Sequence, residues 1–453
     1  MADKKIYEKP IITKHHSGMM NKFGSSPITT PKTEIDGVPV KDLMEKYSSP
    51  LFVLSEKQIR SNFKNAMRIF KNRYPKVQFA WSYKTNYLNA VCAVYHQEGS
   101  WAEVVSGFEY EKARKLGVDG KHIIFNGPDK TDEDLERAIK EKAKIHIDHA
   151  DELYKIIELT EKLNLTADVA IRVNMDTGIY PKWDRFGFNY ENGEAWQALK
   201  RIVINDKLNL IGLHSHIGTY MMTADAYRVA AGKLVSLAKN LSDQFDVNLE
   251  YIDLGGGFAS KNTLKGQYLP AEEVVPTLEQ FADAITSQLL DFATTPDELP
   301  TLILETGRAL IDDAGYLLST VLATKRLSTG KRSIVIDAGV NLLFTSFWYK
   351  HKILPAQEGT VQTENSTIYG PLCMNIDVIR DDITLPVLKK DDKLVIHYVG
   401  AYEVTQWMQF ITTRPNVVMV MDDGTVELVR EKESIEDITR NEKLPEKLKS
   451  FKL

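Results

Sequence analysis

The stretch LEYIDLGGGF, residues 249–258, decides between two fold classes. It is a short apolar run that ends in three glycines, and it is the seventh of eight such strand-like runs along the chain. In a doubly wound open sheet, the glycine-rich turn follows the first strand, and the sheet usually has fewer strands. A triple glycine after the seventh run therefore favours a closed barrel of parallel strands over an open sheet.

The eight runs are short, apolar and rich in β-branched residues, which predicts strands buried on both faces. They are VQFAWS (77–82), AEVV (102–105), IIFN (123–126), KIHID (144–148), DVAIRVN (168–174), NLIGLHSHI (209–217), LEYIDLGG (249–256) and TLILE (301–305). Segments with helical periodicity lie between them, such as DEDLERAIKEK after the third run. The sequence thus predicts an α/β protein with a (β/α)₈ TIM-like barrel over residues 56–310.

After about residue 310 the chain reads as strands separated by turns, in runs such as RSIVIDAGV and KLVIHYVGAY. These runs predict a mostly antiparallel β domain, formed by residues 1–55 and 311–453, in which SPLFVLS is a strand. The charged tail from Glu431 to Leu453 is expected to be a solvated helix and extension.

Composition narrows the function classes. A chain of 453 residues has room for one large and one smaller domain. Its net charge of −5 favours a small-molecule site over nucleic acid or an anionic membrane. The opening MADKKIYEKP has no signal-peptide core and no run resembles a membrane span, so a cytoplasmic protein is expected. Cys92 and Cys373 form neither a disulfide framework nor a metal-ligand spacing, so each is a buried thiol by default.

Barrel enzymes carry their chemistry at the carboxyl ends of the strands. In chain order, the polar residues and glycines at the predicted strand ends are Lys84, Ser106, Glu109, Asn126, Arg172, Asn174, His214, His216, Gly255, Gly256, Gly257, Glu305, Gly307 and Arg308. A lysine, a histidine, a glycine loop and a carboxylate would then lie together at the carboxyl ends of the barrel strands. This arrangement is typical of a cofactor site.

Each of these residues has a purely structural interpretation as well as a functional one. Lys84 could extend past its strand end into water, or it could be held in a pocket for covalent chemistry with a carbonyl. The triple glycine could form only a tight turn, or an anion cradle of bare N–H groups. His216 could be a packed residue or lie flat against an aromatic ring. Glu305 could pair with Arg308 or bind a protonated pyridine nitrogen.

Six motifs occur in one order: YKTN with Lys84, HSHIGT with His216, LGGGF with Gly255–Gly257, ETGR with Glu305–Arg308, GPLC with Cys373 and GAY with Tyr402. From about residue 50 to 430 this set resembles the pyridoxal-phosphate-dependent decarboxylases of the alanine-racemase-like fold, the ornithine, diaminopimelate and arginine decarboxylase family, and most closely the diaminopimelate decarboxylases. The resemblance implies a barrel plus a β domain, pyridoxal 5′-phosphate as cofactor, release of CO₂ from an amino acid, and a homodimer whose active sites lie at the subunit interface.

The same resemblance implies a role for each motif residue. Lys84 would hold the cofactor as a Schiff base, and Glu305 would bond its pyridine nitrogen. Cys373 would come from the partner subunit and reprotonate the decarboxylated carbon. The remaining implied contacts are His216 with the cofactor ring, Gly255, Gly256, Gly257, Thr219, Gly307 and Arg308 with the phosphate, Tyr402 with phosphate or substrate, and Arg308 and Tyr349 with the substrate's distal carboxylate.

Two departures from the family pattern concern the substrate. Met374 follows the cysteine, where the family usually has a glutamate for the substrate amine, and Thr345 stands where it has an arginine for the distal carboxylate. Smaller departures are Glu103 for an aspartate and Thr306 for a proline.

The expected function is an amino-acid decarboxylase related to diaminopimelate decarboxylase. The alternatives are a true meso-diaminopimelate decarboxylase of lysine biosynthesis and a decarboxylase of ornithine, lysine or a carrier-bound amino acid. A racemase and a non-catalytic cofactor-binding protein are less favoured. Racemases of this fold have an arginine at the pyridine nitrogen, whereas Glu305 keeps the ring protonated as an electron sink.

Overall fold

The computed structural model describes residues 30–292, 295–360 and 362–450. Their contacts form two compact units. The barrel unit contains Lys57–Ala314 and Gly400–Thr405, and the β-rich unit contains residues 30–56, Gly315–Val399 and residues 406–450. Within these ranges, no helix has the length and apolar character needed to cross a membrane.

Eight parallel strands close into a barrel in the described part of the first unit, which confirms the predicted fold. The closure is made by pairing of the last strand with the first and of β10 with β8. The strands are β4 (Val77–Ser82), β5 (Trp101–Val104), β6 (Ile123–Phe125), β7 (Lys144–Ile147), β8 (Ala167–Asn174), β10 (Leu208–His214), β11 (Tyr251–Asp253) and β12 (Thr301–Thr306). The short strand β9 (Phe188–Asn189) pairs only with β8 among the described strands.

The barrel closes because its strands are apolar on both faces. Side chains such as Ala80, Ile124, Ala170, Ile211 and Ile303 cluster in one core group, each at most 2% exposed. Full burial of each isoleucine side chain in this group contributes roughly 1.5–3 kcal/mol. Continuous apolar strands need cover outside the barrel as well as inside it.

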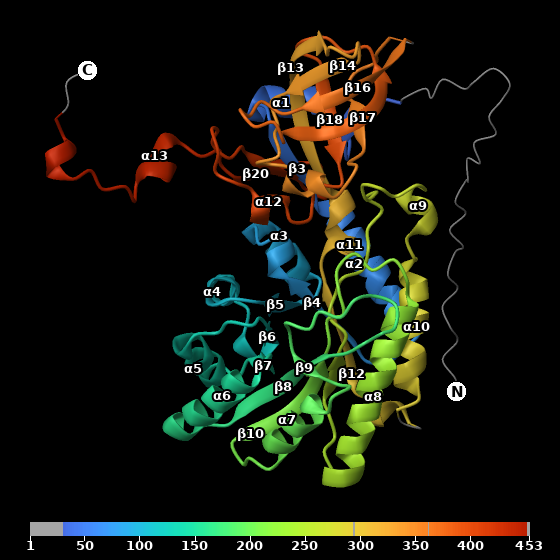
Figure 1. The fold of residues 1–453 in the computed structure, drawn as a ribbon, viewed down its shortest axis with the longest axis vertical. Helices are drawn as coiled ribbons and strands as arrows, with labels where there is room; N and C mark the ends of the chain where they lie inside the picture. Colours follow the sequence, from blue (N-terminus) through green and yellow to red (C-terminus); the bar gives the residue numbers. More distant parts are fainter. Residues whose placement is uncertain (1–29, 293–294, 361, 451–453) are drawn as a thin grey trace. The chain divides into compact units, whose positions relative to one another are not determined.

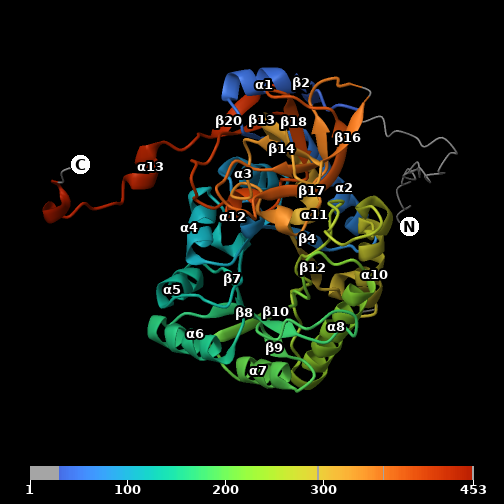
Figure 2. The same ribbon diagram turned by 45° about the horizontal axis from the view of Figure 1, so that its top comes forward.

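Amphipathic helices provide that outer cover. Figure 2 shows α4 to α8 following one another around the strands. The helices of this layer are α2 (Glu56–Lys71), α3 (Asn89–Gln97), α4 (Gly107–Lys115), α5 (Asp132–Lys140), α6 (Ala150–Leu163), α7 (Glu194–Val203), α8 (Asp225–Phe245) and α10 (Leu278–Leu290). After β12 the chain enters the short helix α11 (Arg308–Ile311) and a one-turn helix at Asp312–Ala314, and α9 (Ala271–Val274) lies in the connection between β11 and α10.

Side-chain hydrogen bonds cap the N-termini of several of these helices. Thr131 forms a capping box with Asp134 at the start of α5, and Ser106 accepts a hydrogen bond from the N–H of Glu109 at the start of α4. Such caps satisfy backbone donors that the helix itself leaves free. The cap at Ser106 fixes how the chain leaves β5 and enters α4.

The β-rich unit is built around one mixed sheet (Figure 1). Its long central strand β13 (Gly315–Arg326) runs antiparallel to three neighbours. Two pairs, β14 with β16 and β19 with β3, are parallel. The other strands are β3 (Leu51–Ser55), β14 (Arg332–Ile336), β15 (Ile353–Pro355), β16 (Thr363–Tyr369), β17 (Val378–Pro386), β18 (Lys393–His397), β19 (Val417–Val420) and β20 (Val426–Arg430).

One face of this sheet is covered by the chain's first described helix. Helix α1 (Val40–Tyr47) follows the short hairpin of β1 (Glu34–Ile35) and β2 (Val38–Pro39), and it packs Leu43 and Met44 against a core that includes Leu318 and Val418. The tail carries the exposed helix α13 (Ile435–Thr439), while α12 (Glu403–Gln406) spans the boundary between the units.

Three expectations differ from the structure. Residues 400–405 contact the barrel unit, because the N–H of Tyr402 donates to the carbonyl of Thr85 at 2.8 Å. The sixth strand ends at His214 rather than at residue 217, so His216 lies in the following loop. Cys373 is exposed and not buried, because it lies in a turn after β16 and not in a strand.

Candidate active site

Lys84 lies at the carboxyl end of the first barrel strand, in the one-turn helix Tyr83–Thr85. Its Nζ donates a hydrogen bond of 2.5 Å to Oε2 of Glu103, and the lysine side chain is 36% exposed. Burial opposes the charge of this ammonium, but the carboxylates of Glu103 and Glu305 outweigh that effect and raise the pKa of Lys84. Lys84 is therefore a cation paired inside the barrel mouth.

Two buried carboxylates face an amide at the same end of the barrel. Glu103 on β5 is 1% exposed, and Glu305 on β12 is 4% exposed. Nδ2 of Asn126 donates to Oε1 of Glu103 at 2.9 Å and to Oε1 of Glu305 at 2.5 Å. Glu103 also accepts a hydrogen bond of 2.5 Å from the hydroxyl of Ser82. These contacts place the lysine and both carboxylates in one network.

Two histidines lie beside Glu305 in the barrel interior. Nε2 of His214 is 3.2 Å from Oε1 of Glu305, and Nε2 of His146 is 2.9 Å from the hydroxyl of Tyr251. Burial holds the pKa of both imidazoles well below the ordinary value, and the charge of Arg172 adds to this for His214. Both rings are therefore neutral at neutral pH.

The three glycines form a loop in which side chains would not fit. A Cβ on Gly257 would lie 2.1 Å from the carbonyl oxygen of Gly218, and a Cβ on Gly256 would lie 2.2 Å from that of Glu305. Gly257 also has a φ of +89°, which favours glycine. The N–H of Gly256 donates to Nδ1 of His216 at 3.1 Å. The glycines thus bring bare backbone against the loop after β10 and against the end of β12.

His216 and Thr219 belong to the loop after β10, opposite the glycines. Burial first, and the charge of Arg172 second, lower the pKa of His216 to about 3, so its ring is neutral. Thr219 is exposed. The loop is joined to the glycine loop by a hydrogen bond of 2.9 Å from the N–H of Met221 to the carbonyl of Gly257.

Gly307, Arg308 and Tyr402 complete the mouth around Lys84. A Cβ on Gly307 would lie 2.5 Å from Oγ1 of Thr85. The guanidinium of Arg308 lies 4.9 Å from the ring centre of Tyr402 and 3.6 Å from a carboxylate oxygen of Asp312. Arg308 thus has a carboxylate partner other than Glu305, which is engaged by Asn126.

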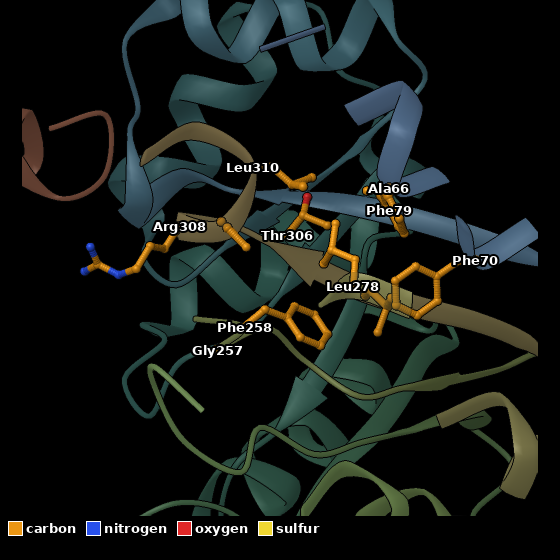
Figure 3. Close-up of a pocket in the computed structure, with 12 residues that line it drawn as sticks. Ala66, Phe70, Phe79, Gly257, Phe258, Leu278, Thr306, Arg308 and Leu310 are labelled. Carbon is orange, nitrogen blue, oxygen red and sulfur yellow. The ribbon is translucent and has the colours of Figure 1, made fainter. Parts of the chain in front are cut away.

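A small cavity of about 20 Å³ lies next to this backbone. It is lined by apolar side chains such as Phe70, Phe258 and Leu278 and by the backbone of Gly257 and Gly307. In Figure 3 the side chain of Arg308 extends away from these apolar groups. A space of this size accommodates about one water molecule and no cofactor. It is a packing gap between the helical layer and the strand ends.

Cys373 belongs to the β-rich unit and is exposed. Its turn is held by Asp377, whose two carboxylate oxygens accept hydrogen bonds from the N–H groups of Val340 and Leu372 at 2.8 and 2.7 Å. Met374, the next residue, is half-buried. The cysteine is thus presented on a turn with a defined shape.

Thr345 and Tyr349 lie on the segment that Asp377 joins to this turn. Thr345 is 1% exposed, and its hydroxyl is 2.9 Å from Nε2 of His351. Tyr349 is 4% exposed. The threonine is therefore a buried, hydrogen-bonded group with no charge to offer a ligand.

Sequence reasoning gave no site role to three residues that the barrel places beside Glu305. Besides Glu103 and His146, the interior contains Asp253, which accepts a hydrogen bond of 2.8 Å from the N–H of Gly255. Burial and the nearby charge of Glu305 raise the pKa of Asp253 well above its ordinary value. In the sequence, each of these three residues is a polar residue inside an apolar run, namely WAEVV, KIHID and YIDLG. This pattern could have identified them. Such a residue in a barrel strand must find its partners in the interior.

The fold and this network define a class of protein. Residues 60–312 match the family described as "Pyridoxal-dependent decarboxylase, pyridoxal binding domain", and the chain belongs to that family. It is a pyridoxal-phosphate-dependent amino-acid decarboxylase that resembles diaminopimelate decarboxylase, as predicted.

Particular relatives agree with this class. The diaminopimelate decarboxylase of Methanocaldococcus jannaschii is 32% identical, over 91% of this chain and 95% of that protein. The Bacillus subtilis diaminopimelate decarboxylase is 27% identical, over 90% and 94%. A crystal structure of the M. jannaschii enzyme in co-complex with L-lysine has a TM-score of 0.84 and 30% identity, covering 93% of this chain and 99% of that one.

The residues present fit the family's cofactor. Lys84 offers an amine for the aldehyde, and Glu305 offers a carboxylate for the pyridine nitrogen. The clashes that a Cβ would make at Gly256 and Gly257 mark a place where only backbone lines the mouth, as a phosphate cradle requires.

Proposed function

We propose that Lys84, Glu305 and Cys373 carry out the decarboxylation, with the other mouth residues binding the cofactor. The observation that carries this proposal is the network that joins Lys84 to Glu305 through Glu103 and Asn126. When bound, pyridoxal phosphate accepts the electron pair left behind as CO₂ departs. Lys84 would hold the cofactor through its Nζ, which is the amine in this network that can bind an aldehyde.

Glu305 gives the site its preference for decarboxylation. A carboxylate next to the pyridine nitrogen favours the protonated ring, which draws electron density away from the α-carbon. Asn126 and His214 lie on one side of this carboxylate, and its exposure is only 4%. In such a low-dielectric place the charge acts more strongly than it would in water.

The remaining residues would hold the cofactor and the substrate. His216, whose ring is neutral, would lie against the pyridine ring. Gly255, Gly256 and Gly257, together with Thr219, Gly307 and Arg308, would bind the phosphate. Tyr402 would contact phosphate or substrate, and Arg308 and Tyr349 would contact the substrate.

We also propose a homodimer in which Cys373 serves the partner subunit's site. Large apolar side chains are exposed on the segments that surround the Cys373 turn: Phe347, Trp348, Ile376, Phe410 and Ile411 are 37% to 59% exposed. The carbonyl of Asn341 accepts from the N–H of Met408, and the side chain of Asn341 donates to Thr412, so these segments lie together. Several large apolar groups gathered on one surface are typical of a protein interface. On this surface Cys373 would deliver its proton to the α-carbon.

The proposed substrate is an amino acid that needs neither of two ionic contacts usual in the family, the glutamate for the substrate amine and the arginine for the distal carboxylate. Thr345 is buried against His351, and Met374 carries no charge, so neither supplies the ionic contact expected for meso-diaminopimelate. Losing one charge-assisted hydrogen bond typically costs about 1.5–3 kcal/mol. Two such losses lower kcat/KM by about two powers of ten or more.

The test compares CO₂ release from meso-diaminopimelate with release from both enantiomers of ornithine and lysine. We expect a smaller diamino acid to be preferred, and Met374→Glu to raise kcat/KM on diaminopimelate by about tenfold. Lys84→Ala is the control for enzymatic release, and borohydride reduction followed by peptide mapping should place the cofactor on Lys84. Turnover of diaminopimelate at about 10⁴ M⁻¹s⁻¹ or better would show that the enzyme is a plain diaminopimelate decarboxylase.

A further inference from the structure

We propose that Asn126 is a positioning residue that holds the carboxylates of Glu103 and Glu305 at one separation. Its amide lies between the carboxylate beside Lys84 and the carboxylate that faces the pyridine nitrogen. The inference rests on the family's cofactor and not on the substrate proposed above. It can therefore fail or succeed independently of that substrate.

The hydrogen-bond chemistry fixes how the amide of Asn126 is oriented. Ionised carboxylates only accept hydrogen bonds, so the NH₂ group must face both of them. The distances of 2.9 and 2.5 Å assign one N–H to Glu103 and the other to Glu305. Oδ1 points away and is buried with no hydrogen-bond partner within the described part of the chain. Among the amino-acid side chains, the carboxamide of asparagine is the smallest neutral group that has two N–H donors on one atom.

The backbone holds Asn126 rigidly in this place. Its N–H donates to the carbonyl of Val104 at 2.8 Å, directly after β6. The next residue, Gly127, has a φ of +102°, and a Cβ there would lie 2.5 Å from the carbonyl oxygen of Val105. The chain therefore turns sharply against β5 immediately after the asparagine. The end of β6 and the tight turn at Gly127 together position the amide and limit its freedom to move.

Two buried carboxylates close together repel each other, so that each needs hydrogen-bond donors to hold its position. The amide of Asn126 donates one N–H to each of them. The charged and titratable groups that interact with one or both carboxylates are Lys84, Glu109, His146, Arg172, His214, His216, Tyr251 and Asp253. Of these, Lys84 touches Glu103 directly, and His214 lies beside Glu305. The side chain of Asn126 donates a hydrogen bond to each of the two carboxylates.

Loss of the two Asn126 hydrogen bonds should change the absorption midpoint and the cofactor affinity in a predictable direction. Without the two donors, the carboxylates of Glu103 and Glu305 are no longer fixed in position, and their negative field at Lys84 and at the pyridine nitrogen is weaker. The protonated form of the link between Lys84 and the cofactor is then less stable. The midpoint of its pH-dependent visible absorption should therefore move to lower pH, and the apoenzyme should bind pyridoxal phosphate more weakly.

The experiment compares Asn126→Ala, Asn126→Asp and the matched control Asn209→Ala. Asn209 makes a similar hydrogen bond of 2.8 Å to Asp168, but it lies at the opposite end of the barrel strands. The readouts are the pH titration of the cofactor absorption, the affinity of apoenzyme for pyridoxal phosphate, and the melting temperature of the apoenzyme. None of them needs a substrate.

We expect Asn126→Ala to weaken cofactor binding by about tenfold or more and to lower the absorption midpoint by about one pH unit. Asn126→Asp, which is nearly isosteric, should fold normally but bind the cofactor more weakly as pH rises and its added carboxyl ionises. Asn209→Ala should leave the absorption midpoint and the cofactor affinity unchanged. Unchanged midpoint and affinity in both Asn126 variants would overturn the proposal. A lower melting temperature without a spectral shift would do so too, because it would show a purely structural role.

Discussion

At the scale of single residues, the chemistry of Lys84 is set by its neighbours. A lysine in water would be a strongly hydrated cation, whereas Lys84 is paired with Glu103 at 2.5 Å inside a barrel mouth. Glu103 is in turn held by Ser82 and Asn126. Because side chains from three strand ends share one network, the reactivity of the lysine depends on positions that no local motif would single out.

Glu305 provides the clearest test at this scale. Glu305→Gln should keep the cofactor bound but lower kcat by several powers of ten, because only the charge that keeps the ring protonated is lost. The measurement pairs steady-state turnover with cofactor content. Glu98→Gln, which removes a carboxylate paired with Arg60 at 2.7 Å on the outer layer, is the control and should retain activity. Unchanged turnover in Glu305→Gln would refute the proposed role.

At the scale of elements, the loops that follow β10, β11 and β12 work as one unit. Gly257 approaches Gly218, Gly256 approaches Glu305, and His216 accepts from the backbone of Gly256. These loops are joined by backbone contacts with no room for side chains. We therefore expect the proposed phosphate cradle to depend on these glycines more than on any charged residue.

Gly257→Ala tests this dependence, with Gly266→Ala as its matched control. Both glycines have φ above +80°, so each alanine brings about 1 kcal/mol of backbone strain. Only the Cβ at position 257 meets another atom, at 2.1 Å, whereas position 266 has open space. We expect Gly257→Ala to lower cofactor affinity by tenfold or more and Gly266→Ala to leave it within about twofold. Equal effects would show that the close approach at Gly257 is unimportant.

At the scale of the whole molecule, the proposed catalytic and substrate-binding residues are divided between the two units. Lys84 and Glu305 belong to the barrel unit, and Cys373 and Tyr349 to the β-rich unit. If Cys373 serves the partner subunit, a site needs two chains, and each chain supplies part of two sites. Symmetric dimers with shared sites have this property.

Mixing two inactive variants tests the shared site. After co-refolding of Lys84→Ala with Cys373→Ala, half of the dimers are mixed, and each mixed dimer has one intact site of two. Activity should then reach about one quarter of the wild-type value, while each variant alone stays low. Activity that remains at the level of the separate variants would place Lys84 and Cys373 of the same chain in one site, or leave Cys373 outside it.

The sequence by itself determined the barrel, because eight apolar runs with helical segments between them have few other solutions. It also determined the cofactor family, because six motifs in one order carry the chemistry at strand ends such as Lys84, Gly257 and Glu305. The position of the triple glycine after the seventh strand, together with the number of strands, favoured the barrel over an open sheet. These features are local or periodic, so a single chain displays them directly.

Only the tertiary structure decided how those residues interact. The bridge of Asn126 between Glu103 and Glu305 joins positions 103, 126 and 305, and no spacing along the chain reveals it. Tyr402 lies far from Thr85 in sequence, yet its N–H reaches that carbonyl, so that residues 400–405 pack with the barrel. The physical reason is that barrel closure brings strand ends together whatever their separation in sequence. Hydrogen bonds and charge interactions depend on distances of a few ångströms, and those distances exist only once the barrel has closed.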